Sequence, residues 1–227
     1  MKRGPKDYLA PGPRSETGMG ITYDHIDDYL YRLAPPRDRL LEKMEESAES
    51  RDVPIIGPLV GRFLYNLARA SQSKSVLEVG TAIGYSGIWL GRAVSPRKGS
   101  VTTIEMDPAR ADEAEKNIAE AGLKNVIKVV RGDALKVLPS LKDEYDLVFL
   151  DSDKEIYPAA FKECQRLLRK GGLFVADNAL WGGDVAKGGT SAATRAMIRF
   201  NKEVSGFPGM STVILPLRDG VLVSLKE

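Results

Sequence analysis

The 227-residue chain has little of several residue types on which common protein functions depend. Its one cysteine, Cys164, permits no internal disulfide, which is typical of a protein from a reducing cytoplasm. Its one histidine, His25, lies near the start, which disfavours a histidine-based zinc site or a Ser-His-Asp triad. No apolar run approaches the roughly 18–20 residues of a membrane helix, and no apolar stretch follows the early positive charges. We therefore expect a soluble, cytoplasmic protein with no membrane partner.

Positive charge is concentrated at one end of the chain. The formal net charge is +2, and residues 1–14 hold four basic residues against one acidic residue. The rest of the chain therefore carries −1 (2 − 3), so it lacks the basic stripe expected of a nucleic-acid-binding domain. Since residues 1–20 are also rich in proline and glycine, we expect residues 1–22 to form a flexible basic arm. Residues 23–227 are expected to form a single domain.

Strand and helix patterns alternate from residue 75 onward. The expected strands are 75–79, 100–105, 125–132, 146–151 and 173–178, and the expected helices are 23–33, 36–50, 58–70, 84–94, 108–121, 156–169 and 192–204. Gly171-Gly172 are expected to end the helix over 156–169, and the glycine-rich segment WGGDVAKGGT is expected to be a loop before the last helix. The segments STVILPL and VLVSLKE flank Arg218-Asp219-Gly220, a pattern typical of a hairpin turn. These patterns predict an α/β fold: a Rossmann-like, doubly wound, mostly parallel sheet with helices on both faces, a C-terminal antiparallel hairpin and extra N-terminal helices.

Polar residues lie at the ends of all five of these strands or directly after them. They are the glycine-rich loop 80–87, Glu105, Asp133, Asp151 and the pair Asp177-Asn178. In parallel sheets of this kind, ligands bind outside the carboxyl ends of the strands. The five positions therefore predict a single site at that edge of the sheet.

The glycine-rich loop runs Gly80-Thr81-Ala82-Ile83-Gly84-Tyr85-Ser86-Gly87. Glycines let a backbone pass close to a ligand and open a helix whose amides face it. The dinucleotide fingerprint needs glycine where Ala82 stands, which disfavours a nicotinamide oxidoreductase. A tight strand-to-helix turn without a ligand is the alternative for this loop alone.

Two acids extend the predicted nucleotide site. Glu105 ends the second strand, where a carboxylate can accept both hydroxyls of an adenosine ribose. Asp133 is expected to cap the helix ALKVLPSL and, from the same place, to face an adenine.

Several motifs of the chain resemble those of one enzyme family. The segment VLEVGTAIGYSG, with Glu105 and GDAL downstream, resembles the cofactor region of class I S-adenosylmethionine-dependent methyltransferases. With FLDSDK, ADNALWGG, TRAMIRFN and LPLRDGVLVSLK, the chain from about residue 24 to its end resembles the catechol and caffeoyl-CoA O-methyltransferase family. The resemblance implies S-adenosylmethionine as cofactor, bound by Glu78, Gly80, Thr81, Gly84, Tyr85, Ser86, Glu105, Met106, Asp133, Ala134 and Asp151. Ile56 and Gly57 match more loosely and are only candidates.

Asp151, Asp177 and Asn178 are the predicted metal ligands. They provide three oxygen donors from two neighbouring strand ends, which suits magnesium or another hard divalent cation. The resemblance implies the same use, while ordinary strand-end turn residues are the alternative. A phenol has a pKa of about 10, which is too high for a nucleophile at neutral pH, and a bound cation lowers it.

Three further side chains complete the predicted site. Lys154 matches the catalytic lysine of the family, and would take the hydroxyl proton as an amine or stabilise an oxyanion as an ammonium. The alternative is an exposed loop lysine. Trp181 and Tyr157 either line the site of an aromatic substrate or pack in the core.

We therefore expect metal-dependent methyl transfer to a hydroxyl of a small catechol-like or caffeoyl-type aromatic acceptor, by a homodimer as in relatives and with no nucleic-acid partner. One alternative is methylation of RNA or another non-catechol acceptor, and another is a non-catalytic S-adenosylmethionine-binding protein. An amino-directed DNA enzyme is disfavoured because Asp151-Ser152-Asp153-Lys154 replaces its Asn/Asp-Pro-Pro-aromatic motif. A pyrimidine C5 enzyme needs a cysteine at its site, and Cys164 is expected within a helix.

Overall fold

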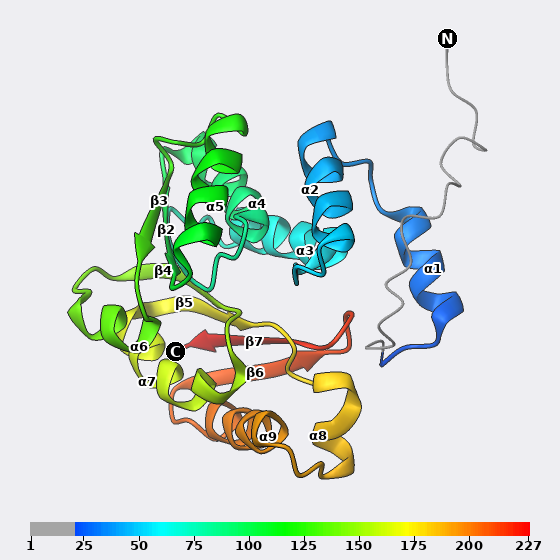
Figure 1. Ribbon diagram of the computed structural model, residues 1–227. Helices are drawn as coiled ribbons and strands as arrows, with labels where there is room; N and C mark the ends of the chain where they lie inside the picture. Colours follow the sequence, from blue (N-terminus) through cyan, green and yellow to red (C-terminus); the bar gives the residue numbers. More distant parts are fainter. Residues whose placement is uncertain (1–20) are drawn as a thin grey trace.

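The strands form one seven-stranded sheet in a computed structural model that describes residues 21–227 (Figure 1). The sheet order is β3-β2-β1-β4-β5-β7-β6, with β7 antiparallel to both of its neighbours. The strands are β1 Ser75–Val79, β2 Ser100–Glu105, β3 Ile127–Arg131, β4 Tyr145–Leu150, β5 Leu168–Ala176, β6 Met210–Leu215 and β7 Val221–Lys226. This topology confirms the predicted mostly parallel sheet with a C-terminal antiparallel hairpin. Of the predicted arm, residues 1–20 lie outside the described residues.

Helices occupy both faces of the sheet. They are α1 Asp24–Leu33, α2 Arg39–Ser50, α3 Gly57–Ala70, α4 Tyr85–Val94, α5 Pro108–Glu120, α6 Ala134–Val137, α7 Tyr157–Leu167, α8 Asp184–Lys187 and α9 Ala192–Ser205. Figure 1 shows α2 to α5 on one side of the sheet and α7 and α9 on the other. Short 3-10 turns lie at Ser95–Arg97, Leu138–Ser140, Lys154–Ile156 and Trp181–Gly183. Within residues 21–227, no helix has both the length and the apolar character needed to cross a membrane.

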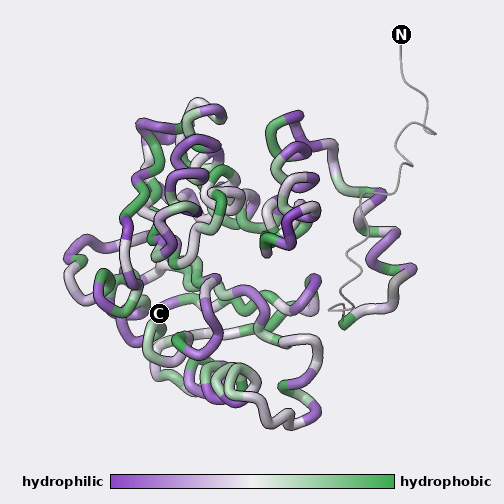
Figure 2. The backbone as a smooth tube through the Cα atoms, viewed as in Figure 1, coloured by the Kyte–Doolittle hydropathy of each residue, from purple (hydrophilic) through white to green (hydrophobic). Residues whose placement is uncertain are grey.

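Strand β4 shows how the sequence produces two cores. Its residues alternate between the faces, so Leu147 and Phe149 join the core beneath α3 and α4, while Val148 and Leu150 join the core beneath α7 and α9. All four side chains are fully buried, which explains the unbroken apolar run. Figure 2 shows the hydrophobic residues concentrated along the strands, and hydrophilic residues on outer helices such as α1.

Two predictions for the part of the chain after β4 are wrong. The helix expected over residues 156–169 ends at Leu167, and β5 begins at Leu168 and includes Gly171-Gly172, which were predicted to end the helix. The reason is an early pairing of Leu168 with Tyr145, followed by a register shift. The segment WGGDVAKGGT was expected to be a loop, yet it contains a 3-10 turn and α8.

A buried polar network joins α2 to the start of α4. The Tyr85 hydroxyl donates to Oε1 of Glu45 over 2.5 Å. Arg37 donates through Nε and Nη2 to Oε2 of the same carboxylate, over 3.0 and 2.8 Å. Burial and the negative charge of Glu45 raise the pKa of Tyr85, so the hydroxyl stays protonated and remains a donor. The network therefore anchors the helix that follows the glycine-rich loop.

Tyr85→Phe should lower the free energy of unfolding by about 1.5–3 kcal/mol, since it removes a hydrogen bond to a buried charged group. Urea denaturation followed by circular dichroism measures the change. Tyr65→Phe is the matched control, because the Tyr65 ring also packs edge-on against Trp89, at 6.4 Å compared with 6.5 Å for Tyr85. Equal losses in the two variants would show that the Glu45 network adds nothing.

Candidate active site

Gly80 brings two loops of the site into direct contact. Its φ of +93° is a left-handed conformation that favours glycine, and a Cβ added there would lie 1.8 Å from the carbonyl oxygen of Asp151. Gly84 also has a positive φ, +89°, where it precedes the first turn of α4. The loop after β1 therefore needs glycine at residue 80 to pack closely against the loop after β4, in addition to any contact with a cofactor.

Glu105 holds the glycine-rich loop from the end of β2. Its Oε2 accepts from the Ala82 amide and its Oε1 from the Asp107 amide, each over 2.8 Å. Both oxygens keep further lone pairs for a ligand. Met106, the next residue, is 63 % exposed, which is unusual for a large apolar side chain. The pair offers a carboxylate and an apolar surface side by side, as an adenosine requires.

The loop after β3 has the predicted capping geometry. Oδ1 of Asp133 accepts from the Leu135 amide over 2.9 Å at the start of α6, which confirms the predicted cap. Ala134 is the first residue of α6 and is half-buried. The Gly132 amide donates to the Glu105 carbonyl over 2.8 Å, so Asp133 lies next to the end of β2. This loop therefore adjoins Glu105 and Met106.

Glu78 is a fully buried acid inside β1. Its Oε2 accepts from the hydroxyls of Thr81 and Thr103, over 2.9 and 2.5 Å. Burial raises the pKa of Glu78, and these hydroxyls together with Ser86 oppose the shift. Its Oε1 has no hydrogen-bond partner within the described part of the chain. Glu78 therefore braces the loop through Thr81 and keeps one oxygen for a polar group of a ligand.

Tyr85, a predicted cofactor-binding residue, directs its side chain toward α2. The ring is buried, and its hydroxyl is bonded to Glu45 on α2. A Tyr at this position is directed away from the sheet edge because it is the first residue of α4 and packs beneath α2. Any contact of Tyr85 with a cofactor would therefore come from its backbone.

Asp151 and Asp177 lie side by side where β4 and β5 end. Leu150 pairs with Ala176, and the Asp177 amide donates to the Leu150 carbonyl over 3.1 Å. The hydrogen bonds between β4 and β5 therefore continue as far as the two acids. Asp177 is 2 % exposed, and its Oδ1 has no hydrogen-bond partner in residues 21–227. Burial and the charge of Asp151 raise the pKa of Asp177 above its ordinary value. This buried, unpartnered carboxylate oxygen would be satisfied by a cation.

Asn178 completes the predicted donor set and lies beside Asp219, an acid that was not predicted to belong to the site. Its Nδ2 donates to Oδ2 of Asp219 over 3.1 Å. Asp219 is also 2 % exposed, because the hairpin tip folds back onto the segment after β5. Within residues 21–227, no group of three or more His, Cys, Asp or Glu side chains is arranged to hold a metal. The candidate set instead consists of two carboxylates and one amide.

Lys154 is not an exposed loop lysine, the alternative considered above. Its Nζ donates to Oδ1 of Asp151, to the carbonyl of Ser152 and to the hydroxyl of Tyr157, each over 2.9 Å. Burial lowers the pKa of Lys154, but the charges and hydrogen bonds of Asp151 and Tyr157 raise it more, so the net shift is upward. In this arrangement Lys154 is an ammonium rather than a free amine.

Tyr157 and Trp181, the two aromatic residues predicted to line a substrate site, differ in their burial. Tyr157 is fully buried and packs edge-on against Phe200, with ring centroids 5.0 Å apart. The structure therefore gives Tyr157 a packing role in place of the predicted substrate contact. Trp181 is half-buried in the turn after Asn178, where its amide donates to the Asn178 carbonyl over 3.1 Å. Trp181 therefore keeps part of its surface exposed, and its contact with a substrate stays a prediction.

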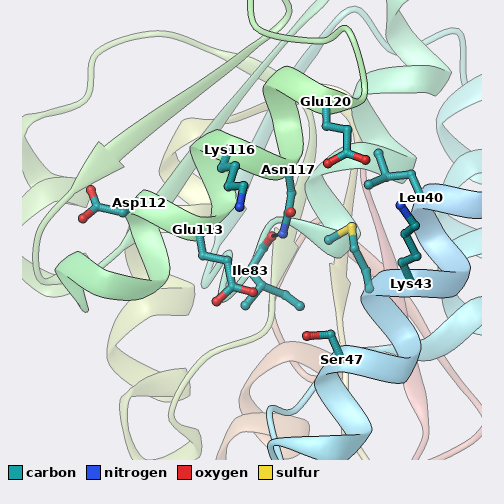
Figure 3. Close-up of a pocket in the computed structure, with 10 residues that line it drawn as sticks. Leu40, Lys43, Ser47, Ile83, Asp112, Glu113, Lys116, Asn117 and Glu120 are labelled. Atoms are coloured by element: carbon teal, nitrogen blue, oxygen red, sulfur yellow. Dashed lines mark hydrogen bonds between the residues drawn. The ribbon is translucent and has the colours of Figure 1, made fainter.

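A pocket of about 520 Å³ lies between α2 and α5, away from these residues (Figure 3). It is lined by Leu40, Lys43, Met44, Ser47, Ile83, Asp112, Glu113, Lys116, Asn117 and Glu120. Ile83 is its one residue from the glycine-rich loop, and Asn117 holds that residue by donating to its carbonyl over 2.9 Å. Apart from Ile83, no residue predicted for the site lines this pocket, so it lies behind the glycine-rich loop and away from the strand-end acids.

Comparison with known proteins identifies the family. The family model described as O-methyltransferase matches residues 37–227. The chain belongs to the O-methyltransferase family. A catechol O-methyltransferase from Niastella koreensis is 36 % identical to this O-methyltransferase over 212 residues, 90 % of this chain and 93 % of that protein. A catechol O-methyltransferase from Mycobacterium tuberculosis is 38 % identical over 193 residues, 84 % of this chain and 87 % of that protein.

Solved structures of similar proteins agree with the fold and the cofactor. The O-methyltransferase TomG from Streptomyces achromogenes, in complex with S-adenosylmethionine, has a TM-score of 0.81 and 30 % identity, covering 90 % of this chain and 96 % of TomG. An O-methyltransferase from Bacillus cereus, in complex with S-adenosylhomocysteine, has a TM-score of 0.82 and 29 % identity, covering 89 % of this chain and 97 % of that one. This protein is thus an S-adenosylmethionine-dependent O-methyltransferase, as the resemblance implied.

Glu105→Ala should weaken S-adenosylmethionine binding by about 1.5–3 kcal/mol, the range for hydrogen bonds to a charged group. Isothermal titration calorimetry measures the loss. Glu120→Ala is the control, because Glu120 is an exposed acid on α5 and its removal changes the net charge equally. Unchanged affinity in a folded Glu105→Ala protein would remove Glu105 from the cofactor site.

Proposed function

We propose that this O-methyltransferase transfers the methyl group to a hydroxyl of a small catechol-like or caffeoyl-type aromatic compound, with magnesium or another hard divalent cation at Asp151, Asp177 and Asn178. The observation that carries the proposal is the buried Asp177 Oδ1, which has no partner in the described chain and lies beside a second carboxylate. The names of the two catechol O-methyltransferase relatives support the class of acceptor. A homodimer is part of the proposal, and a nucleic-acid partner is not.

The donor chemistry fits such a cation. A buried ionised carboxylate is costly unless it is paired or coordinates a metal, and Asp177 has neither a salt bridge nor a partner for Oδ1 within residues 21–227. Carboxylate and amide oxygens are the ligands that magnesium prefers. When bound, a hard divalent cation lowers the pKa of a phenolic hydroxyl and neutralises the charge that develops on its oxygen.

The ammonium of Lys154 adds a second, fixed positive charge. It is 10 % exposed and held by three oxygen acceptors, so its direction is set before a substrate arrives. A positive group held in this way stabilises negative charge on an acceptor oxygen. Burial lowers the pKa of Lys154, and the charge of Asp151 raises it. A cation bound at Asp151 would offset that charge, so removal of the hydroxyl proton stays the second predicted role of Lys154.

Chelation should abolish methyl transfer to catechol while leaving S-adenosylmethionine binding intact, because the cofactor residues come mainly from the loops after β1, β2 and β3. EDTA treatment followed by a turnover assay tests this, and added magnesium should restore the rate. Asp177→Ala should mimic chelation, since it removes one of three protein ligands.

Asp153→Ala is the matched control, since Asp153 is an exposed acid in the loop after β4. Its turnover and its response to magnesium should equal those of the unmodified protein. Full turnover in EDTA, with no metal detected in the purified protein, would contradict the proposed metal dependence.

A further inference from the structure

Asp219 occupies an unusual position for an acid in a hairpin turn. Its Oδ1 accepts from the Gly182 amide and its Oδ2 from the Asn178 side chain, so both oxygens are engaged. The backbone fixes the same contact, because the Ala179 amide donates to the Gly220 carbonyl over 2.8 Å and the Leu180 amide to the Asp219 carbonyl over 3.0 Å. The β6–β7 hairpin tip is thus docked on the segment that follows β5.

The contact decides which end of the Asn178 side chain faces Asp219 and which end faces away from it. The two ends of a side-chain amide are nearly equal in size, and one donates hydrogen bonds while the other accepts them. An ionised carboxylate only accepts, so the atom that faces Asp219 is Nδ2. Oδ1 of Asn178 therefore lies on the side of the amide away from Asp219, and it accepts no hydrogen bond from residues 21–227.

We propose that Asp219 is a positioning residue that sets the amide orientation of Asn178 and thereby makes its oxygen a metal ligand. The inference rests on the proposed metal-dependent function. It adds to that function a residue outside the donor set, and it explains why an acid is buried at the tip of a hairpin. The neighbouring Arg218 supports the placement, because its Nη1 donates to the carbonyl of Ile55 over 2.6 Å and holds the tip against the segment before α3.

Asp219→Asn tests the inference with almost no change in shape. The new side chain still accepts from Gly182 through its oxygen, which places its NH₂ group opposite the NH₂ group of Asn178. Two donors cannot pair, so Asn178 should turn its oxygen toward residue 219 and its NH₂ group toward the cation. Affinity for Mn²⁺ should fall about 10–100-fold, the usual effect of losing a partner that orients a metal ligand.

The double variant Asn178→Asp with Asp219→Asn should recover most of this loss. A carboxylate at position 178 accepts from the NH₂ group at 219 with one oxygen and keeps the other oxygen for the cation. The double variant also has the same net charge as the unmodified protein. Asp153→Asn controls for the charge alone, since it removes one carboxylate from an exposed position in the loop after β4; its Mn²⁺ affinity should change less than threefold.

Mn²⁺ binding is measured on the full chain by electron paramagnetic resonance without an acceptor, with S-adenosylmethionine affinity as the test of folding. If the unmodified protein binds no Mn²⁺, the proposed function fails and this inference fails with it. If the unmodified protein binds Mn²⁺, only the inference is at stake. Unchanged affinity in Asp219→Asn, a loss of equal size in Asp153→Asn, or no recovery in the double variant would each overturn it.

Discussion

The pairing of β1 with β4, and of β4 with β5 over Leu147–Leu150, is the constraint on which the site depends. The hydrogen bonds continue one residue past each strand, from the Asp151 amide to the Val79 carbonyl and from the Asp177 amide to the Leu150 carbonyl. A shift of one residue in either pairing would send an acid to the other face of the sheet. The buried alternation of β4 prevents such a shift, because it would move four fully buried apolar side chains between two cores.

This register concentrates negative charge where water is scarce. Asp151, Asp177 and Asp219 come together from three chain segments, and the nearby positive charges are the side chains of Lys154 and Arg218. Lys154 pairs with Asp151 in the described chain, whereas Oδ1 of Asp177 has no partner there. This excess of negative charge destabilises the folded protein when no ligand is bound, and it favours the binding of a cation. The methyl donor is itself cationic at sulfur, so the same charges also favour its approach.

The sequence predicts the fold well because its signals are local. Alternating apolar patterns, the Asp107 and Asp133 caps and the Arg218-Asp219-Gly220 turn place most elements within one or two residues. It predicts the location of the site because parallel strand ends share one edge. It does not predict which way a side chain is directed once there. Tyr85 and Tyr157 are buried by packing on α2 and α9, and Asp219 is buried by a hairpin that folds back, and these contacts are distant in sequence.

The central claim is that the strand-end acids bind a cation that promotes ionisation of the acceptor hydroxyl. Ultraviolet difference spectroscopy tests it most directly, because a phenolate absorbs at longer wavelength than its phenol. The protein saturated with S-adenosylhomocysteine is titrated with catechol at neutral pH, with and without magnesium. The account predicts a catecholate band only when magnesium is present. A band of equal size without the metal, or neutral catechol bound in its presence, would contradict the account.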